Sequence, residues 1–172
     1  CHRHSHEGRQ GDGCVWVSLN DRKGEFLESE CSNGGGDSLL AVDLNGDAYL
    51  DLTTIGRETG EVAILFNSGD GNMMEPVLYP VGGAFIRSAD LDGDSSPDLV
   101  AGAYDRARVL LNDGEGAFSL AQAYEYETGL ILEDMSLADI DGDDTVDLIA
   151  ALGAVQWCGP PRFPSSNAII VF

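Results

Sequence analysis

The segment "ADLDGDSSPDL", residues 89–99, places four aspartates within nine positions. Two more copies follow the same pattern, "VDLNGDAYLDL" at 42–52 and "ADIDGDDTVDL" at 138–148. Their first aspartates lie 47 and 49 residues apart. A regular period of this length is typical of a repeat architecture, in which each copy is one small structural unit.

A glycine motif recurs in register with the acidic one. It reads "FNSGDGNM" at 66–73 and "LNDGEGAF" at 111–118, with a weaker relative, "LNDRKGEF", at 19–26. From each motif's Asn to the next first aspartate the interval is 23, 23 and 27 residues. We call the acidic segments acidic loops 1 (43–51), 2 (90–98) and 3 (139–147), and the two complete glycine motifs glycine turns 1 (66–73) and 2 (111–118).

The segments between these turns indicate short strands. Residues 62–66 and 109–111 are apolar without alternation, which is typical of strands buried on both faces. No window shows a helical period. Four-stranded units at this period predict an all-β fold of propeller-type, four-stranded antiparallel blades.

The strand groups predicted by the spacing hold two, four, four and three strands, thirteen in total. The predicted organisation is an N-terminal tail (1–13), a half repeat (14–36), repeat 1 (37–83), repeat 2 (84–131) and an interrupted repeat 3 (132–172) with an insertion at 153–166. About three blades plus partial strands make an incomplete ring.

Each acidic loop is similar to the front half of an EF-hand calcium loop. Side-chain oxygens stand at positions 1, 3, 5 and 9, and position 7 offers its backbone carbonyl. The candidate ligands are Asp43, Asn45, Asp47, Tyr49 and Asp51 in loop 1, Asp90, Asp92, Asp94, Ser96 and Asp98 in loop 2, and Asp139, Asp141, Asp143, Thr145 and Asp147 in loop 3. Calcium favours such oxygen ligands, so about three Ca²⁺ ions are predicted. The alternative is that Asp, Asn and Gly only form solvated turns.

Two departures from the EF-hand loop matter. Position 12 is Thr54, Ala101 or Ala150 rather than Glu, and strand-like residues follow, so an EF-hand domain is excluded. The ninth-position aspartates are therefore expected to close the site, bidentately. Position 6, often a glycine with positive φ, is Ala48, Ser95 or Asp144.

The excess of acidic residues disfavours some classes of binding partner. The chain has 30 acidic and 9 basic residues and a formal net charge of -21, which disfavours nucleic acid and anionic membranes as partners and favours cations. No apolar run is long enough for a membrane span. The sequence begins at Cys1 rather than Met, which suggests a processed protein or a fragment.

Four cysteines, without a CxxC pair, predict two disulfides in an oxidising, extracellular compartment and leave three pairings open: Cys1, Cys14, Cys31 and Cys158. The three histidines, His2, His4 and His6, all lie in the tail, where they either bind a metal or are incidental. A Ser or Cys nucleophile therefore has no histidine base in the repeats, and we expect no enzyme.

The aromatic residues allow two interpretations. They either pack within blades or stack on sugar rings: Trp16, Trp157, Tyr49, Tyr79, Tyr104, Tyr124 and Tyr126.

The acidic and glycine motifs together resemble the FG-GAP/VCBS repeats of integrin α-subunit propellers and of many secreted proteins. The resemblance implies four-stranded antiparallel blades, a calcium ion in the hairpin between the first two strands of each blade, and usually seven blades. This chain supplies fewer. We therefore expect an extracellular calcium-binding structural or adhesive module that assembles head to tail as a homo-oligomer or filament, or that joins other blades of a longer chain. The alternatives are a lectin-like propeller that binds glycans or cell-surface proteins, and a non-catalytic fragment of a larger secreted protein.

Overall fold

The computed structural model describes residues 13–27, 31–56, 59–126, 130–154 and 168–171. Within these residues the chain is all-β and forms thirteen strands in four antiparallel sheets, which in chain order have two, four, four and three strands, as the spacing predicted. None of the sheets closes into a barrel. The same part of the chain contains no helix with the length and hydropathy of a membrane span.

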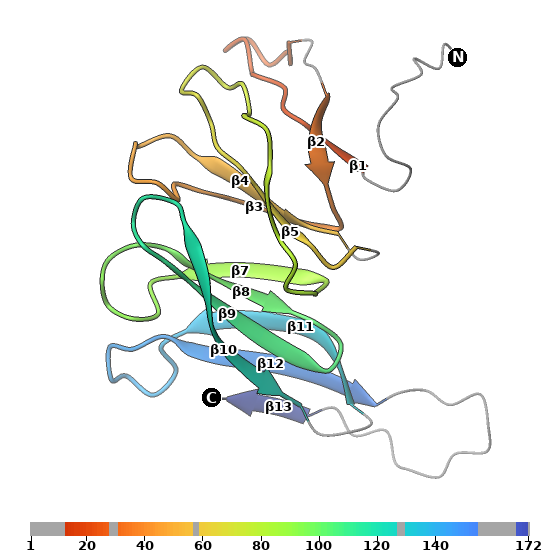
Figure 1. The fold of residues 1–172 in the computed structure, drawn as a ribbon, viewed down its shortest axis with the longest axis vertical. Coiled ribbons are helices and arrows are strands. Elements are labelled where there is room, and N and C mark those ends of the chain that lie inside the picture. The colour runs from red at the N-terminus through yellow and green to blue at the C-terminus, as the bar shows by residue number, and fades with distance from the viewer. Residues whose placement is uncertain (1–12, 28–30, 57–58, 127–129, 155–167, 172) are drawn as a thin grey trace, which may run out of the picture.

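The sheets follow one another along the chain (Figure 1). The half-sheet pairs β1 (Gly13–Trp16) with β2 (Cys31–Gly35). Sheet 1 has the order β3 (Ser38–Val42), β4 (Asp51–Ile55), β5 (Val62–Leu65) and β6 (Val77–Tyr79). Sheet 2 has the order β7 (Phe85–Ala89), β8 (Asp98–Gly102), β9 (Arg106–Asn112) and β10 (Phe118–Glu125). Sheet 3 has the order β11 (Leu130–Ala138), β12 (Asp147–Ala154) and β13 (Ala168–Val171).

Each acidic loop connects the first two strands of its sheet. The pairs that close the three hairpins are Val42 with Asp51, Ala89 with Asp98, and Ala138 with Asp147. The ninth-position aspartate is therefore the first residue of the second strand in sheets 1, 2 and 3. All three loops project from the same side of the stack (Figure 1).

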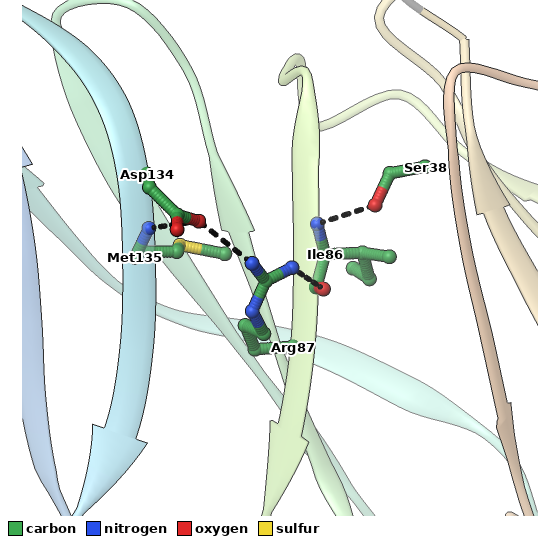
Figure 2. Close-up of polar contacts among 5 residues, drawn as sticks. All are labelled: Ser38, Ile86, Arg87, Asp134 and Met135. Atoms are coloured by element: carbon green, nitrogen blue, oxygen red, sulfur yellow. Dashed lines mark hydrogen bonds and ion pairs between the residues drawn. The ribbon is translucent and has the colours of Figure 1, made fainter.

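The first strands of neighbouring sheets lie side by side. In Figure 2 the Ile86 N–H of β7 donates to Ser38 Oγ of β3 at 3.4 Å, and the Arg87 guanidinium pairs with Asp134 of β11 at 2.8 Å. This places β3, β7 and β11 at one side of their sheets. It is the arrangement of propeller-type blades that form an incomplete ring.

Apolar clusters fill the spaces between sheets. Ile55 and Ile64 of sheet 1 pack with Ile86 and Leu99 of sheet 2, and a similar cluster joins sheets 2 and 3. A smaller cluster joins the half-sheet to sheet 1 through Val15 and Leu65. Strand β5 is buried on both faces, as its unbroken apolar run predicted, whereas the same prediction was wrong for residues 109–111, of which only Leu110 is buried. Each fully buried aliphatic side chain contributes about 1.5–3 kcal/mol, so these clusters hold the blades together.

A disulfide joins Cys14 to Cys31 across the half-sheet. Because an isolated two-stranded sheet is marginally stable, this bond compensates for the small size of the half-sheet. The other two cysteines, Cys1 and Cys158, lie outside the described residues, as do the tail histidines, Trp157 and most of the insertion.

Candidate metal-binding loops

The first aspartate of each acidic loop shapes the loop. Asp90 accepts hydrogen bonds from the backbone N–H groups of Gly93 and Ser95, and Asp43 and Asp139 accept the same pair of bonds in their loops, at 2.7–3.0 Å. One carboxylate therefore draws positions 4 and 6 toward itself. Each oxygen of this carboxylate keeps a lone pair that can accept a further hydrogen bond or bind a cation.

Position 6 adopts positive φ in all three loops although it is never glycine. The angles are 71° at Ala48, 72° at Ser95 and 67° at Asp144. A side chain in this left-handed region costs roughly 1–2 kcal/mol. The hydrogen bond to position 1 holds the residue there, so the loops keep the backbone shape that the missing glycine had put in question.

The ninth aspartates of loops 1 and 2 are fully buried. In Asp98, Oδ1 accepts the Asn112 N–H and Oδ2 accepts the Leu91 N–H, both at 2.8 Å. Asp51 accepts the N–H groups of Asn67 and Leu44 in the same way, both at 2.9 Å. Position 9 thus ties its own acidic loop to the glycine turn of the same sheet.

Burial raises the pKa of Asp51 and Asp98 above the ordinary aspartate value, and repulsion from the other loop carboxylates adds to it. The N–H donors act in the opposite direction. A buried, ionised carboxylate among other carboxylates is unfavourable unless positive charge compensates it.

Positions 1, 3 and 9 converge. Ligand oxygens of Asp90, Asp92 and Asp98 lie within 4.8 Å of one another, and the same holds for the corresponding residues of loop 3, Asp139, Asp141 and Asp147. Such a set of carboxylates could hold a metal ion. In loop 1, Asn45 at position 3 replaces one carboxylate with an amide oxygen, which accepts the Asp47 N–H.

The fifth position does not belong to these converging sets. Oδ1 of Asp94 accepts the Ser96 N–H at 2.7 Å, and Oδ1 of Asp143 accepts both the N–H and the hydroxyl of Thr145. The bond from the Thr145 hydroxyl lowers the pKa of Asp143. In loop 1, Asp47 accepts the N–H of Tyr49 and the side-chain amide of Asn45. The carbonyls of Tyr49, Ser96 and Thr145 remain predicted ligands.

The loops have little positive charge of their own. The ion pairs recorded between described residues join Arg87 to Asp134 and Arg106 to Asp105 and Glu125, and none reaches an acidic loop. These ion pairs therefore do not neutralise the acidic loops, and a bound metal ion could do so. The donor set of hard oxygens in a flexible loop fits Ca²⁺ better than a transition metal, which prefers His or Cys.

Sequence reasoning missed the role of the glycine-turn asparagines. Asn67 and Asn112 each donate a backbone N–H to the ninth aspartate and accept N–H groups of the following glycines. The signal was present, since this Asn recurs in all the glycine motifs, and in the two complete motifs it follows the ninth aspartate of its sheet by 16 and 14 residues.

A separate cleft of about 390 Å³ lies between the half-sheet and sheet 1, lined by Gly34, Thr54, Glu61, Glu75 and neighbours. Its lining, among the described residues, contains no aromatic side chain. Tyr79 packs edge-on against Phe118, with ring centroids 5.8 Å apart, and Tyr126 is buried. Blade packing thus accounts for these two of the predicted sugar-stacking residues.

Comparison with known families identifies part of the chain. Residues 90–150 match the sequence profile described as the FG-GAP-like repeat. This segment is similar to an FG-GAP-like repeat. The match begins at the first aspartate of loop 2 and extends through loop 3, so it confirms the resemblance for these two loops, while loop 1 lies outside the match.

Proposed function

We propose that this chain is an extracellular calcium-binding structural and adhesive repeat module, without catalytic activity. The observation that carries the proposal is the convergence of positions 1, 3 and 9 in acidic loops 2 and 3, around a ninth aspartate that is buried in loop 2. FG-GAP repeats often bind calcium and are typically extracellular. A disulfide in the half-sheet agrees with an oxidising compartment.

Calcium has a static role in this proposal. The residues that would hold it are the fifteen predicted ligands, with positions 1, 3 and 9 at the centre of each site. Two carboxylates about 4 Å apart repel by about 1 kcal/mol even at the dielectric constant of water, and by more near a protein surface. A divalent cation removes this repulsion and stabilises the first hairpin of each blade. Extracellular modules bind calcium at about 10⁻⁴ to 10⁻³ M, so such sites fill outside cells.

The test is thermal unfolding with and without calcium. EDTA should lower the melting temperature and added calcium should restore it. Asp92→Ala should reduce the calcium-dependent gain, whereas Glu115→Ala, which removes an exposed charge from the same repeat, should preserve it. A preparation shown by elemental analysis to be metal-free, and as heat-resistant as the loaded protein, would refute the proposal.

Head-to-tail assembly is supported by residues that occupy equivalent places in the repeats. In the first strands, Ile86 and Met135 are 1% and 3% exposed because a preceding sheet covers them, but the equivalent Leu39 is 61% exposed. At loop position 2, Leu44 is 1% exposed beneath the next sheet, but Ile140 of loop 3 is 57% exposed. The two uncovered faces correspond to the two sides of an interface that the chain forms twice internally. We infer that sheet 3 of one copy packs against the β3 side of the next.

Sedimentation velocity over a range of concentrations tests this assembly, and negative-stain microscopy shows whether the products are rings or filaments. Leu39→Asp should abolish them, while Leu120→Asp, at a 57% exposed position on β10, should not. A chain that stays monomeric at high concentration in calcium would contradict self-assembly and leave calcium binding unaffected.

A further inference from the structure

Asn112 connects two acidic loops that belong to different sheets. It is buried at the end of β9, and its backbone N–H donates to Asp98 Oδ1 at 2.8 Å. Its side-chain amide donates to the Pro97 carbonyl of loop 2 at 3.1 Å and to the Leu44 carbonyl of loop 1 at 2.9 Å. One side chain thus binds the backbone of both loops.

The connection continues to the other ninth aspartate. Leu44 accepts from Asn112 through its carbonyl and donates its own N–H to Asp51 Oδ2 at 2.9 Å. The two buried carboxylates, Asp98 and Asp51, are therefore linked by an unbroken series of hydrogen bonds through Asn112 and Leu44.

Packing supports the same connection. Glycine turn 2 lies directly on loop 1, because a Cβ placed on Gly116 would come within 2.7 Å of the Phe66 ring and 3.4 Å of the Asn45 Cβ. Leu44 is buried in one cluster with Leu99 and Leu110 of sheet 2. Movement of loop 1 therefore disturbs the turn that holds loop 2.

The other glycine turn lacks this link. Asn67 donates its N–H to Asp51 at 2.9 Å and its amide to the Leu50 carbonyl at 3.2 Å, both within its own sheet. The described residues of the half-sheet contain no acidic loop for it to reach. Loop 3 is not covered by a following turn within the described chain, since Ile140 is exposed.

We propose that Asn112 is a positioning residue that couples cation binding at acidic loops 1 and 2. The proposal rests on the calcium-binding function proposed above. A cation that orders loop 1 fixes the Leu44 carbonyl, which fixes Asn112 and the Asp98 carboxylate, so the second cation has less backbone left to order. Coupling of this kind is reciprocal, and we expect a factor of about fivefold in affinity, the lower end of the usual range.

Site-resolved calcium titration followed by amide NMR tests the coupling. Each loop carries a glycine at position 4 whose N–H reports on that loop: Gly46, Gly93 and Gly142. Asp43→Ala disables loop 1. The midpoint at Gly93 should then rise about fivefold, and the midpoint at Gly142 should stay unchanged.

Repeating the Asp43→Ala change in two variant proteins tests whether Asn112 carries the fivefold shift at Gly93. In Asn112→Ala, the further change Asp43→Ala should no longer alter the Gly93 midpoint. In Asn67→Ala, which removes the matching asparagine without an intersheet bond, the fivefold effect should remain. Persistence of the effect in Asn112→Ala would overturn the role of this residue.

The remaining outcomes distinguish failure of the coupling from failure of the proposed calcium binding. If all three glycines respond to calcium but Asp43→Ala leaves Gly93 unchanged, the coupling is refuted and calcium binding stands; this comparison does not require any Asn112 variant to fold. An equal shift at Gly142 would show a general loss of stability and also refute the coupling. If no glycine responds to calcium, both proposals fail.

Discussion

Replacing Asp98 with asparagine separates the two tasks that the structure gives to position 9. The carboxylate accepts two backbone N–H groups at 2.8 Å, from Asn112 and Leu91. Asparagine keeps one acceptor and turns an amide donor toward the other N–H. Losing one hydrogen bond to a charged group costs about 1.5–3 kcal/mol. Removing a buried charge that Asp92 and Asp94 repel acts in the opposite direction, so without calcium we expect a loss below about 3 kcal/mol.

Calcium should enlarge this loss. A ligand at one hundred times its dissociation constant stabilises the folded state by about 2.7 kcal/mol per site. Because Asp98→Asn removes one of the three converging carboxylates of loop 2, the variant should forfeit this gain. The free-energy difference between the unaltered chain and the variant should therefore grow by about 2.7 kcal/mol between EDTA and saturating calcium.

Urea unfolding followed by circular dichroism, in EDTA and in calcium, measures both differences. Glu115→Gln, an exposed change in the same repeat, is the control and should shift stability by less than about 0.5 kcal/mol under both conditions. An equal loss for Asp98→Asn in EDTA and in calcium would show that position 9 only connects the loop to the turn through hydrogen bonds and does not bind calcium.

Three further predictions concern other parts of the chain. Ala48→Gly should stabilise the protein by about 1 kcal/mol in urea unfolding, since φ at this position is 71° and glycine removes the steric cost of the methyl group. Replacing both Cys14 and Cys31 with serine should cost about 3 kcal/mol, measured by the same method, because the bond closes a loop with a separation of 17 residues. Tyr126→Phe should be neutral or stabilising, since the described residues offer its buried hydroxyl no partner. Burial raises the pKa of Tyr126 to about 12, so stability present below pH 10 is lost as the pH rises toward 12, and the phenylalanine variant should lose less in alkaline unfolding.

The repeat register and the strand groups could be predicted from sequence because they depend on local turn chemistry. Asp, Asn and Gly at fixed spacing specify a hairpin whatever the rest of the chain does. The aspartates at 43, 90 and 139 therefore mark the end of the first strand in every sheet. The positive φ at position 6 depends on similar local hydrogen bonds, and the sequence alone did not predict it because no glycine stands there.

The contacts between sheets could not be predicted in this way. Nothing in a single repeat shows that the Asn112 amide reaches Leu44, 68 residues earlier in the chain. Nor does the motif show that Leu39 is exposed while Ile86, at the equivalent place, is buried. These properties depend on whether another sheet packs alongside, and the sequence of one repeat motif does not specify which sheet does so.

The hydrogen bonds of the acidic loops bear on how calcium acts. A site that forms only with its metal leaves its ligands disordered until the ion binds. Here the position 1 aspartate already holds positions 4 and 6, and the position 9 aspartate of loops 1 and 2 already holds two further N–H groups. These bonds shape the loop backbone but hold mutually repelling carboxylates close together, so we expect a cation to order the loop further by removing that repulsion. Withdrawal of calcium should accordingly leave the strands paired and lower the stability of the blades, with amide exchange accelerating first in the loops and only later in β5 and β8.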